Sequence, residues 1–332
     1  MGKRKRFLAL SFLGLSLVLT LSCGSRHDAD EKYVLVSANL QVPYWKAAAA
    51  GFTHEGSVRK LRSWVVGPDT YDAKAEQDEL KKAIQQKPSG ILISVADPAV
   101  LTGDINQAIA AGIPVLTIDS DAPTSKRLFF IGTNNYQAGL MGGMRLATEL
   151  HGQGNVVVFT MPGQPNLNDR LRGYRAAWES HPQIKITQIV DIKGDPRVAF
   201  DTTEQLLGKK VPINAFVCLE AQAGKEVATV LNNHSVKDKL VMAMDTDPDT
   251  LDWIQKGVIV ATISQKPYTM ASFGLRLLDD LYHEKPNPLD ADWSTNSLSP
   301  VPAFVDTGSD LIDKANVEAF VAANRSATSA PE

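Results

Sequence analysis

Short runs of consecutive apolar residues alternate along this chain with longer segments in which apolar residues recur every three or four positions. The short runs lack an alternating polar face, which is typical of strands covered on both sides. We expect strands at 33–38, 61–66, 90–94, 113–118, 155–160, 184–190, 215–219, 240–244 and 258–263. The longer segments predict helices at 73–86, 101–111, 136–150, 169–180, 199–207, 223–232 and 268–283.

Strands that alternate with helices of this length predict parallel βαβ units. The alternation occurs twice, in a similar order, on either side of about Asn134. The sequence therefore predicts an α/β fold with two doubly wound lobes, each built on a parallel sheet. Ligands of such sheets bind at the carboxyl ends of the strands, so polar residues that follow the strands are the candidates for a site.

Three crossings between the lobes are expected, near 132–135, at Gln265 and within 298–305. The predicted N-terminal lobe comprises 33–133 and 266–297, and the predicted C-terminal lobe comprises 134–265 and 298–325. The last residues, 326–332, are small and polar, and we expect a disordered tail there.

The first 23 residues have the pattern of an export signal. Four basic residues, 3–6, precede an uncharged apolar run of about 15 residues, which is shorter than the ~20 needed to span a bilayer. The segment ends at Cys23 and resembles a bacterial lipoprotein signal, in which the cysteine becomes the lipidated first residue. Thr20 stands where such signals usually have leucine, so ordinary secretion remains the alternative. Residues 24–32 are then a linker, and the expected location is the periplasm or the cell surface.

Composition narrows the function classes. A formal net charge of −3 with interspersed signs argues against a nucleic-acid surface. Of the two cysteines, Cys218 lies in an apolar run and is expected to be a buried, inert thiol. The histidines and cysteines lack metal-ligand spacing, and we find no nucleophile elbow, P-loop or dinucleotide fingerprint. We therefore expect no enzyme activity, no metal and no cofactor.

Seven short motifs, in order and at compatible spacing, resemble the type I periplasmic solute-binding proteins of the ribose-binding-like branch. The resemblance covers roughly residues 33–307. Its most specific motif is the segment Gly-Ile-Pro-Val-Leu-Thr-Ile-Asp at 112–119. The other six are Pro-Tyr-Trp at 43–45, the strand 90–94 with Asp97, and the segments 131–139, 170–174, 244–248 and 261–267. The resemblance implies two lobes joined by a three-crossing hinge. Transcription repressors share these lobes, but they carry a DNA-binding segment where this chain has an export signal.

A sugar needs aromatic rings against its C–H faces and charge-assisted hydrogen bonds to its hydroxyls. The resemblance implies that Asp119 and Asp245 accept hydrogen bonds from ligand hydroxyls, one from each lobe, and that Arg170 donates to ligand oxygens. The complete set of expected ligand-binding residues is Tyr44, Trp45, Asp119, Arg170, Glu220, Asp245 and Gln265.

Two positions depart from the family's pattern. Many members have an arginine after the first aspartate, where this chain has Ser120, and many have Asn-Asp where it has Glu220 and Ala221. The expected pocket thus loses one cation and one amide relative to many members, and it gains a carboxylate at Glu220. These carboxylates suit a hydroxyl-rich neutral ligand or a cationic one, and they repel an acidic sugar.

The expected function is capture of a sugar or polyol in the cleft by hinge closure, without chemistry, and delivery to an ABC permease served by a separate ATPase subunit. We expect a monomer whose only membrane attachment is the lipid on Cys23. One alternative is the ligand-binding component of a chemotaxis or sensor-kinase system. A second alternative is an exported glycosidase, with Asp119 and Asp245 as acid and base.

Overall fold

The computed structural model describes residues 27–28, 30–296 and 298–328 of the 332. The predicted signal segment 1–23 and the lipidation of Cys23 lie outside the described residues, as do residues 24–26 and 29 of the predicted linker. Within the described part, no helix is both long enough and apolar enough to cross a membrane.

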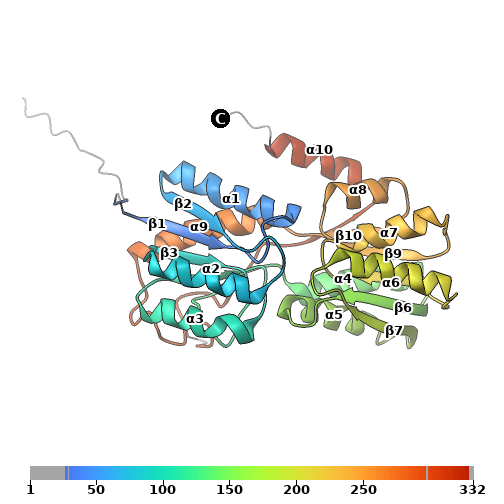
Figure 1. Cartoon of the computed structure of the whole chain (residues 1–332), viewed down its shortest axis with the longest axis horizontal. Helices are drawn as coiled ribbons and strands as arrows, with labels where there is room; N and C mark the ends of the chain where they lie inside the picture. Colours follow the sequence, from blue (N-terminus) through green and yellow to red (C-terminus); the bar gives the residue numbers. More distant parts are fainter. Residues whose placement is uncertain (1–26, 29, 297, 329–332) are drawn as a thin grey trace, which may run out of the picture. The chain divides into compact units, whose positions relative to one another are not determined.

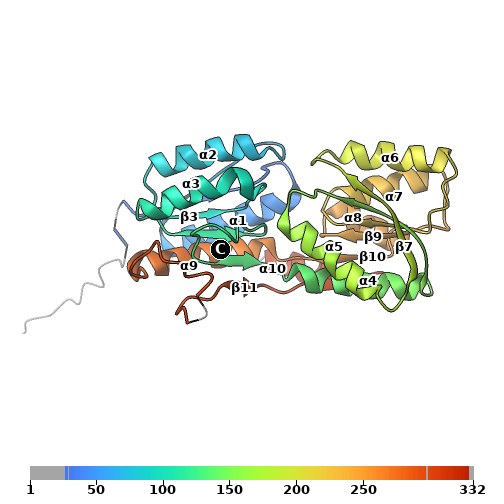
Figure 2. The same cartoon turned by 90° about the horizontal axis from the view of Figure 1, so that it is seen from below.

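The N-terminal lobe is built on a six-stranded, all-parallel sheet in the order β11-β5-β4-β3-β1-β2. Helices α2 and α3 cover one face of this sheet, and α1 and α9 pack together on the other (Figures 1 and 2). The strands are β1 (Lys32–Val36), β2 (Arg62–Val66), β3 (Gly90–Ile93), β4 (Val115–Ile118), β5 (Phe130–Gly132) and β11 (Phe304–Asp306). The helices are α1 (Pro43–Arg59), α2 (Ala73–Gln85), α3 (Pro98–Ala110) and α9 (Pro267–His283).

The C-terminal lobe repeats this plan with a sheet in the order β12-β10-β9-β8-β6-β7, in which only β12 is antiparallel to its neighbour. Helices α4 and α5 pack together on one face, and α6 and α7 on the other (Figure 2). The strands are β6 (Gln153–Thr160), β7 (Gln183–Asp191), β8 (Ala215–Cys218), β9 (Leu240–Met244), β10 (Ala261–Ser264) and β12 (Asp310–Asp313). The helices are α4 (Asn135–Glu149), α5 (Pro165–Ala177), α6 (Pro196–Gly208), α7 (Ala223–Asn233), α8 (Pro248–Gln255) and α10 (Val317–Thr328).

The predicted fold class is confirmed. Strands β3, β4 and β8 are buried along their whole length, as expected for continuous apolar strands covered on both faces. Each sheet lies in its own hydrophobic core, and Cys218 is buried in the core of the C-terminal lobe. The fold thus brings two sets of strand carboxyl ends, one from each lobe, to the segments that connect the lobes.

The structure differs from the sequence analysis at two boundaries. The segment 298–305 was assigned to the third crossing, but Phe304 pairs with Phe130, so β11 extends the N-terminal sheet. The two phenylalanine rings stack with 5.2 Å between their centroids. Because β11 pairs with β5 up to residue 306 and β12 begins at 310, the third crossing lies at 307–309. Helix α10 continues to Thr328 through a segment rich in alanine, the best helix former, so it includes the first three residues of the predicted tail 326–332.

Close contact between α4 and α5 fixes the helix that carries Arg170. A Cβ atom built on Gly139 of α4 would collide with the main-chain carbonyl oxygen of Arg170. Gly51 of α1 lies in the same way against the carbonyl oxygen of Tyr268 of α9, so both lobes use a glycine to let a helix pair approach. No methyl group fits at Gly139 unless the backbone of α5 moves.

We therefore expect Gly139→Ala to lower the free energy of unfolding by about 1–3 kcal/mol, because the added methyl group overpacks a backbone contact. Urea denaturation would measure this loss. The control is Gly103→Ala on α3, where a Cβ atom meets nothing within 4 Å and alanine should stabilise the helix by about 0.5–1 kcal/mol. A Gly139→Ala protein as stable as the unsubstituted one would contradict this packing argument.

Candidate functional site

A narrow cavity of about 20 Å³ lies where the carboxyl ends of both sets of strands meet. Residues from both lobes and from the second crossing line it, as the strand-end rule for such sheets predicts. The lining residues are Tyr44, Trp45, Tyr71, Asp119, Met161, Gln164, Asn166, Arg170, Glu220, Ala221, Asp245 and Gln265. All seven predicted ligand-binding residues are among them, and we call this cavity the cleft.

The two aromatic residues enter the cleft from the first turn of α1, which begins at Pro43. A proline suits this position because it lacks an N–H that would stay unpaired there. The Tyr44 hydroxyl donates a 2.7 Å hydrogen bond to Oδ1 of Asp119, and Nε1 of Trp45 donates to the Tyr71 hydroxyl at 3.1 Å. Both rings are therefore held in place by polar contacts at the wall of the cleft.

Asp119 and Asp245 occupy equivalent positions in the two lobes. Each follows a central strand, β4 or β9, in the left-handed backbone region, with φ of 62° and 67°. Each main-chain N–H also donates to the neighbouring strand, to the carbonyl of Ile131 or of Ile263. This conformation is uncommon for residues other than glycine, asparagine and aspartate. Because the two backbones match, both lobes present a carboxylate to the cleft.

Arg170 is the single cation among the described residues that line the cleft. Its guanidinium is 2% exposed and makes three hydrogen bonds to uncharged acceptors. Nε donates to Oδ1 of Asn135 at 2.8 Å, Nη1 to the carbonyl of Leu219 at 2.6 Å and Nη2 to Oε1 of Gln265 at 2.9 Å. Asn135 and Gln265 adjoin the first and second crossings, so one side chain connects two hinge segments to the end of β8.

The lobes also meet directly in the cleft. Nδ2 of Asn166, in the first turn of α5, donates to Oδ2 of Asp119 at 3.3 Å. Gln265, at the second crossing, donates through Nε2 to Oδ1 of Asp245 at 2.9 Å. With so little free volume between them, the walls must separate before a sugar can enter, and the three connecting segments permit such a motion.

Glu220 lines the cleft and also organises its own loop. Its two carboxylate oxygens accept hydrogen bonds from the main-chain N–H groups of Gln222 and Ala223, at 2.8 and 2.6 Å. These contacts fix the turn between β8 and α7. Each oxygen of Glu220 thus already accepts one hydrogen bond from the backbone. Its predicted contact with a ligand would have to use the remaining lone pairs of these oxygens.

Burial raises the pKa of every carboxylate in the cleft, because the charged form loses its hydration. The pKa of Asp245 rises to about 7 against the opposing charge of Arg170, and that of Glu220 rises to about 7 against its two backbone hydrogen bonds. Burial also raises the pKa of Asp119, which Arg170 and the Tyr44 hydroxyl oppose. A ligand that donates hydrogen bonds would favour the charged forms.

Tyr71 was missed by the sequence analysis. It follows β2 in a loop without a family motif, and in the fold it packs against the hydrophobic cores of both lobes and accepts a hydrogen bond from Trp45. Gln164 and Asn166 lie in a segment that follows β6, where polar strand-end residues are expected, although neither was predicted individually.

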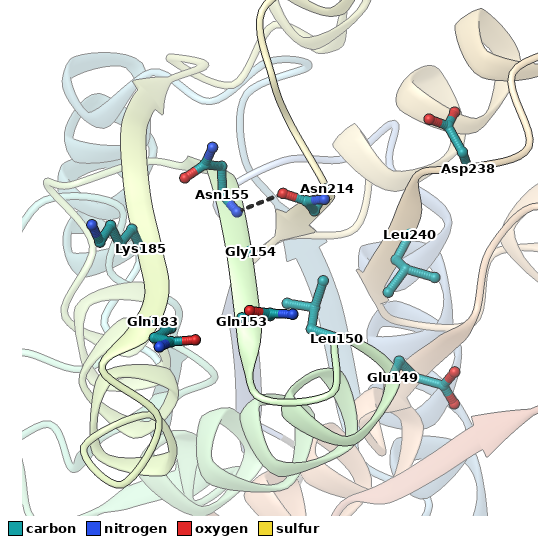
Figure 3. A pocket seen from close by; sticks show the side chains of 10 residues that line it. All are labelled: Glu149, Leu150, Gln153, Gly154, Asn155, Gln183, Lys185, Asn214, Asp238 and Leu240. Carbon is teal, nitrogen blue, oxygen red and sulfur yellow. Dashed lines mark hydrogen bonds between the residues drawn. The ribbon is translucent and has the colours of Figure 1, made fainter.

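A wider hollow of about 730 Å³ lies at the opposite, amino ends of the C-terminal strands (Figure 3). Its side chains come from the end of α4 and the starts of β6, β7 and β9. Oδ1 of Asn214 accepts from the N–H of Asn155 at 2.8 Å, so this asparagine connects the strand starts. The hollow lies away from the strand carboxyl ends, where ligands of parallel sheets bind, and it collects no buried charged group.

Comparison with known proteins agrees with this geometry. The family described as periplasmic binding protein domain matches residues 33–286. The chain belongs to this family. Among curated proteins, a xylose/arabinose-binding protein of Sulfolobus acidocaldarius is 24% identical over 78% of this chain, which spans 65% of that relative's length. A ribose import binding protein of Bacillus subtilis is 25% identical over 75% of this chain and 80% of its own length.

A solved structure of a sugar-binding protein has the same fold. An arabinose binding protein from Geobacillus stearothermophilus superimposes with a TM-score of 0.72 and is 32% identical, covering 88% of this chain and 99% of its own. Periplasmic binding proteins are extracytoplasmic, which agrees with the expected export. These comparisons concern the family and the fold, so the ligand-binding role of each of the seven residues stays a prediction.

The raised pKa of Asp245 predicts how stability changes with pH. The aspartate ionises at pH ~4 in the unfolded chain and near 7 in the fold, so its contribution to stability is present at low pH and is lost as the pH rises from about 4 to 7. Between pH 5 and pH 8 this loss is about 2–3 kcal/mol. Asp245→Asn removes the ionisable group, and with it this pH-dependent loss of stability, and asparagine also tolerates the left-handed backbone conformation.

We therefore expect the difference in free energy of unfolding between pH 5 and pH 8 to be smaller in Asp245→Asn than in the unsubstituted protein. Urea titrations at both pH values measure it. Asp252→Asn, which removes a half-exposed carboxylate from α8, is the matched control. An identical pH dependence in all three proteins would mean that Asp245 is not desolvated as the structure shows.

Proposed function

We propose that this protein captures a small sugar or polyol in the cleft and delivers it to an ABC permease served by a separate ATPase. The observation that carries the proposal is the convergence, in one cavity, of a carboxylate from each lobe, one buried guanidinium and two aromatic rings. Each group matches one demand of a carbohydrate: hydroxyl donors, oxygen acceptors and C–H faces. The relatives named above, which bind xylose, arabinose or ribose, support a pentose as the first ligand to test.

Closure would couple binding to a change of shape. Asp119 belongs to the N-terminal lobe and Asp245 to the C-terminal lobe, so a sugar contacts both only when the lobes come together. A ligand with more contacts in the closed state shifts the equilibrium toward that state. The permease would then recognise the closed form. A lipid on Cys23 would hold the protein at the membrane beside the permease; this anchor and the monomeric state are part of the proposal.

Binding needs no bond-breaking step, and we propose that the protein is not an enzyme. The carboxylates of the cleft already serve as hydrogen-bond acceptors, from Tyr44 and Asn166 at Asp119 and from Gln265 at Asp245. Incubation with aryl glycosides of the sugars that bind should release no aglycone. Measurable turnover would instead support the glycosidase alternative.

A ligand screen by thermal shift, followed by calorimetry, tests the proposal. We expect a pentose, hexose or polyol to raise the melting temperature, and Asp119→Asn to weaken its affinity by about 10–100-fold. The asparagine keeps the backbone conformation and loses the charged acceptor, which is worth about 1–3 kcal/mol. Asp201→Asn, at an exposed position on α6, is the control and should bind like the unsubstituted protein.

Two results would count against the proposal. A folded protein that binds no sugar or polyol in the screen would remove the ligand class. Undiminished binding by Asp119→Asn and by Asp245→Asn would place the sugar somewhere other than the cleft.

A further inference from the structure

A chamber of about 100 Å³ adjoins the cleft and shares Tyr44, Asp245 and Gln265 with it. Its other walls come from the start of α1, the loop between β9 and α8, and the start of α9. Four small or rigid apolar residues form most of these walls: Pro43, Ala47, Pro248 and Pro267. A substituent of a few heavy atoms on a sugar held in the cleft would fit in this chamber, whereas a second sugar ring would not.

Asp247 supplies the chamber with an unusual carboxylate. The residue is 4% exposed, and its buried Oδ2 atom has no hydrogen-bond partner among the residues that the structure describes. A buried acceptor left unpaired costs about 1–3 kcal/mol, and a ligand that donates a hydrogen bond to this carboxylate would offset part of that cost. Asp247 is one of the residues that line the chamber, so it is near any substituent that enters there.

Asp247 precedes a helix, and the hydrogen bond expected at that position is missing. The residue stands at the N-cap of α8, where an aspartate ordinarily accepts from the first N–H groups of the helix. The N-cap aspartates of α2, α3 and α6 do so, whereas the side chain of Asp247 forms no such bond to the described backbone. The capping interaction, worth roughly 1 kcal/mol, is therefore not made at α8, and Asp247 is a lining residue of the chamber instead.

Charge decides which substituent fits. Four buried carboxylates line the cleft and the chamber, Asp119, Glu220, Asp245 and Asp247, against the single guanidinium of Arg170. That guanidinium donates its hydrogen bonds to uncharged acceptors. The positive charge of Lys225 also acts on Asp247, but its Nζ lies 3.7 Å from the carboxylate of Asp249. An ammonium group offers three donors and a positive charge, whereas a hydroxyl offers one donor and no charge.

We propose that the ligand is a carbohydrate that carries a protonated amine, with the ammonium group in the chamber against Asp247 and the sugar ring in the cleft. This inference rests on the proposed function and narrows its ligand class. The apolar prolines and alanine exclude water around the ion pair, which strengthens it. An acidic substituent is excluded by repulsion from the four carboxylates.

Calorimetry at pH 7 on the full chain tests the inference with matched pairs of ligands. The pairs are D-glucose and D-galactose with their 2-amino-2-deoxy and 6-amino-6-deoxy forms, and methyl α-D-arabinofuranoside with its 5-amino-5-deoxy form. We expect at least one amine to bind about tenfold or more tightly than its hydroxyl parent, as a charge-assisted bond is roughly twice as strong as a neutral one.

Asp247→Asn should reduce that preference to about threefold or less, because the uncharged amide no longer forms an ion pair with the ammonium group. Asp252→Asn removes the same charge from the exposed side of α8 and should leave the preference unchanged. Melting curves confirm that both variants fold. The asparagine remains a good N-cap residue, so α8 should not be lost.

Other outcomes overturn the inference in distinguishable ways. If hydroxyl sugars bind and no amine binds more tightly, or if Asp247→Asn retains the preference, the ammonium site is wrong and the proposed function stands. If the folded protein binds neither the hydroxyl sugars nor the amines, both proposals fail.

Discussion

The buried guanidinium of Arg170 is the interaction on which the arrangement of the cleft depends. Its three hydrogen bonds reach Asn135 after the first crossing, the end of β8 at Leu219 and Gln265 at the second crossing. A planar fork with fixed donors can hold three such acceptors in one geometry, which a flexible lysine could not. Gln265 then holds Asp245, so the position of one carboxylate follows from that of one arginine. The same positive charge opposes the rise that burial causes in the pKa values of Asp119 and Asp245.

The two lobes share two local features, a glycine at a helix–helix contact and an aspartate after a central strand, so their walls of the cleft resemble each other. In each lobe a glycine lets one helix touch the backbone of another, and in each lobe a central strand ends on an aspartate in the left-handed conformation. The lobes differ where the ligand must be distinguished. The first lobe adds the aromatic pair, and the second adds the arginine together with Glu220 and Asp247. A ligand bound as proposed would therefore meet similar acceptors on both sides but rings on only one.

Much of this could be predicted from the sequence, because strands buried on both faces are continuous apolar runs. The predicted strand 240–244 coincides with β9, and all seven predicted site residues lie in the cleft. Helix starts were predicted less well. Helices α3, α5 and α6 begin three or four residues earlier than expected, each at a proline, because the fixed φ of proline suits the first helical position. The three-residue strands β5 and β11 are too short to show a periodicity, and only their pairing defines them. Tyr71 was not predicted because its place in the cleft depends on tertiary contacts, including the one with Trp45. Asp247 was not predicted because only the structure shows that its side chain does not cap α8.

The most direct test of the clamp is the distance between the lobes with and without a sugar. Spin labels on Asp78→Cys of α2 and Asp201→Cys of α6, both exposed, report this distance by pulsed electron resonance. Cys218 is buried and should not react, and Cys23→Ser removes the other thiol. The account predicts a longer and broader distance distribution without sugar, and a shorter, narrower one when a pentose, hexose or amino sugar saturates the protein. A distribution that sugar binding leaves unchanged would contradict it.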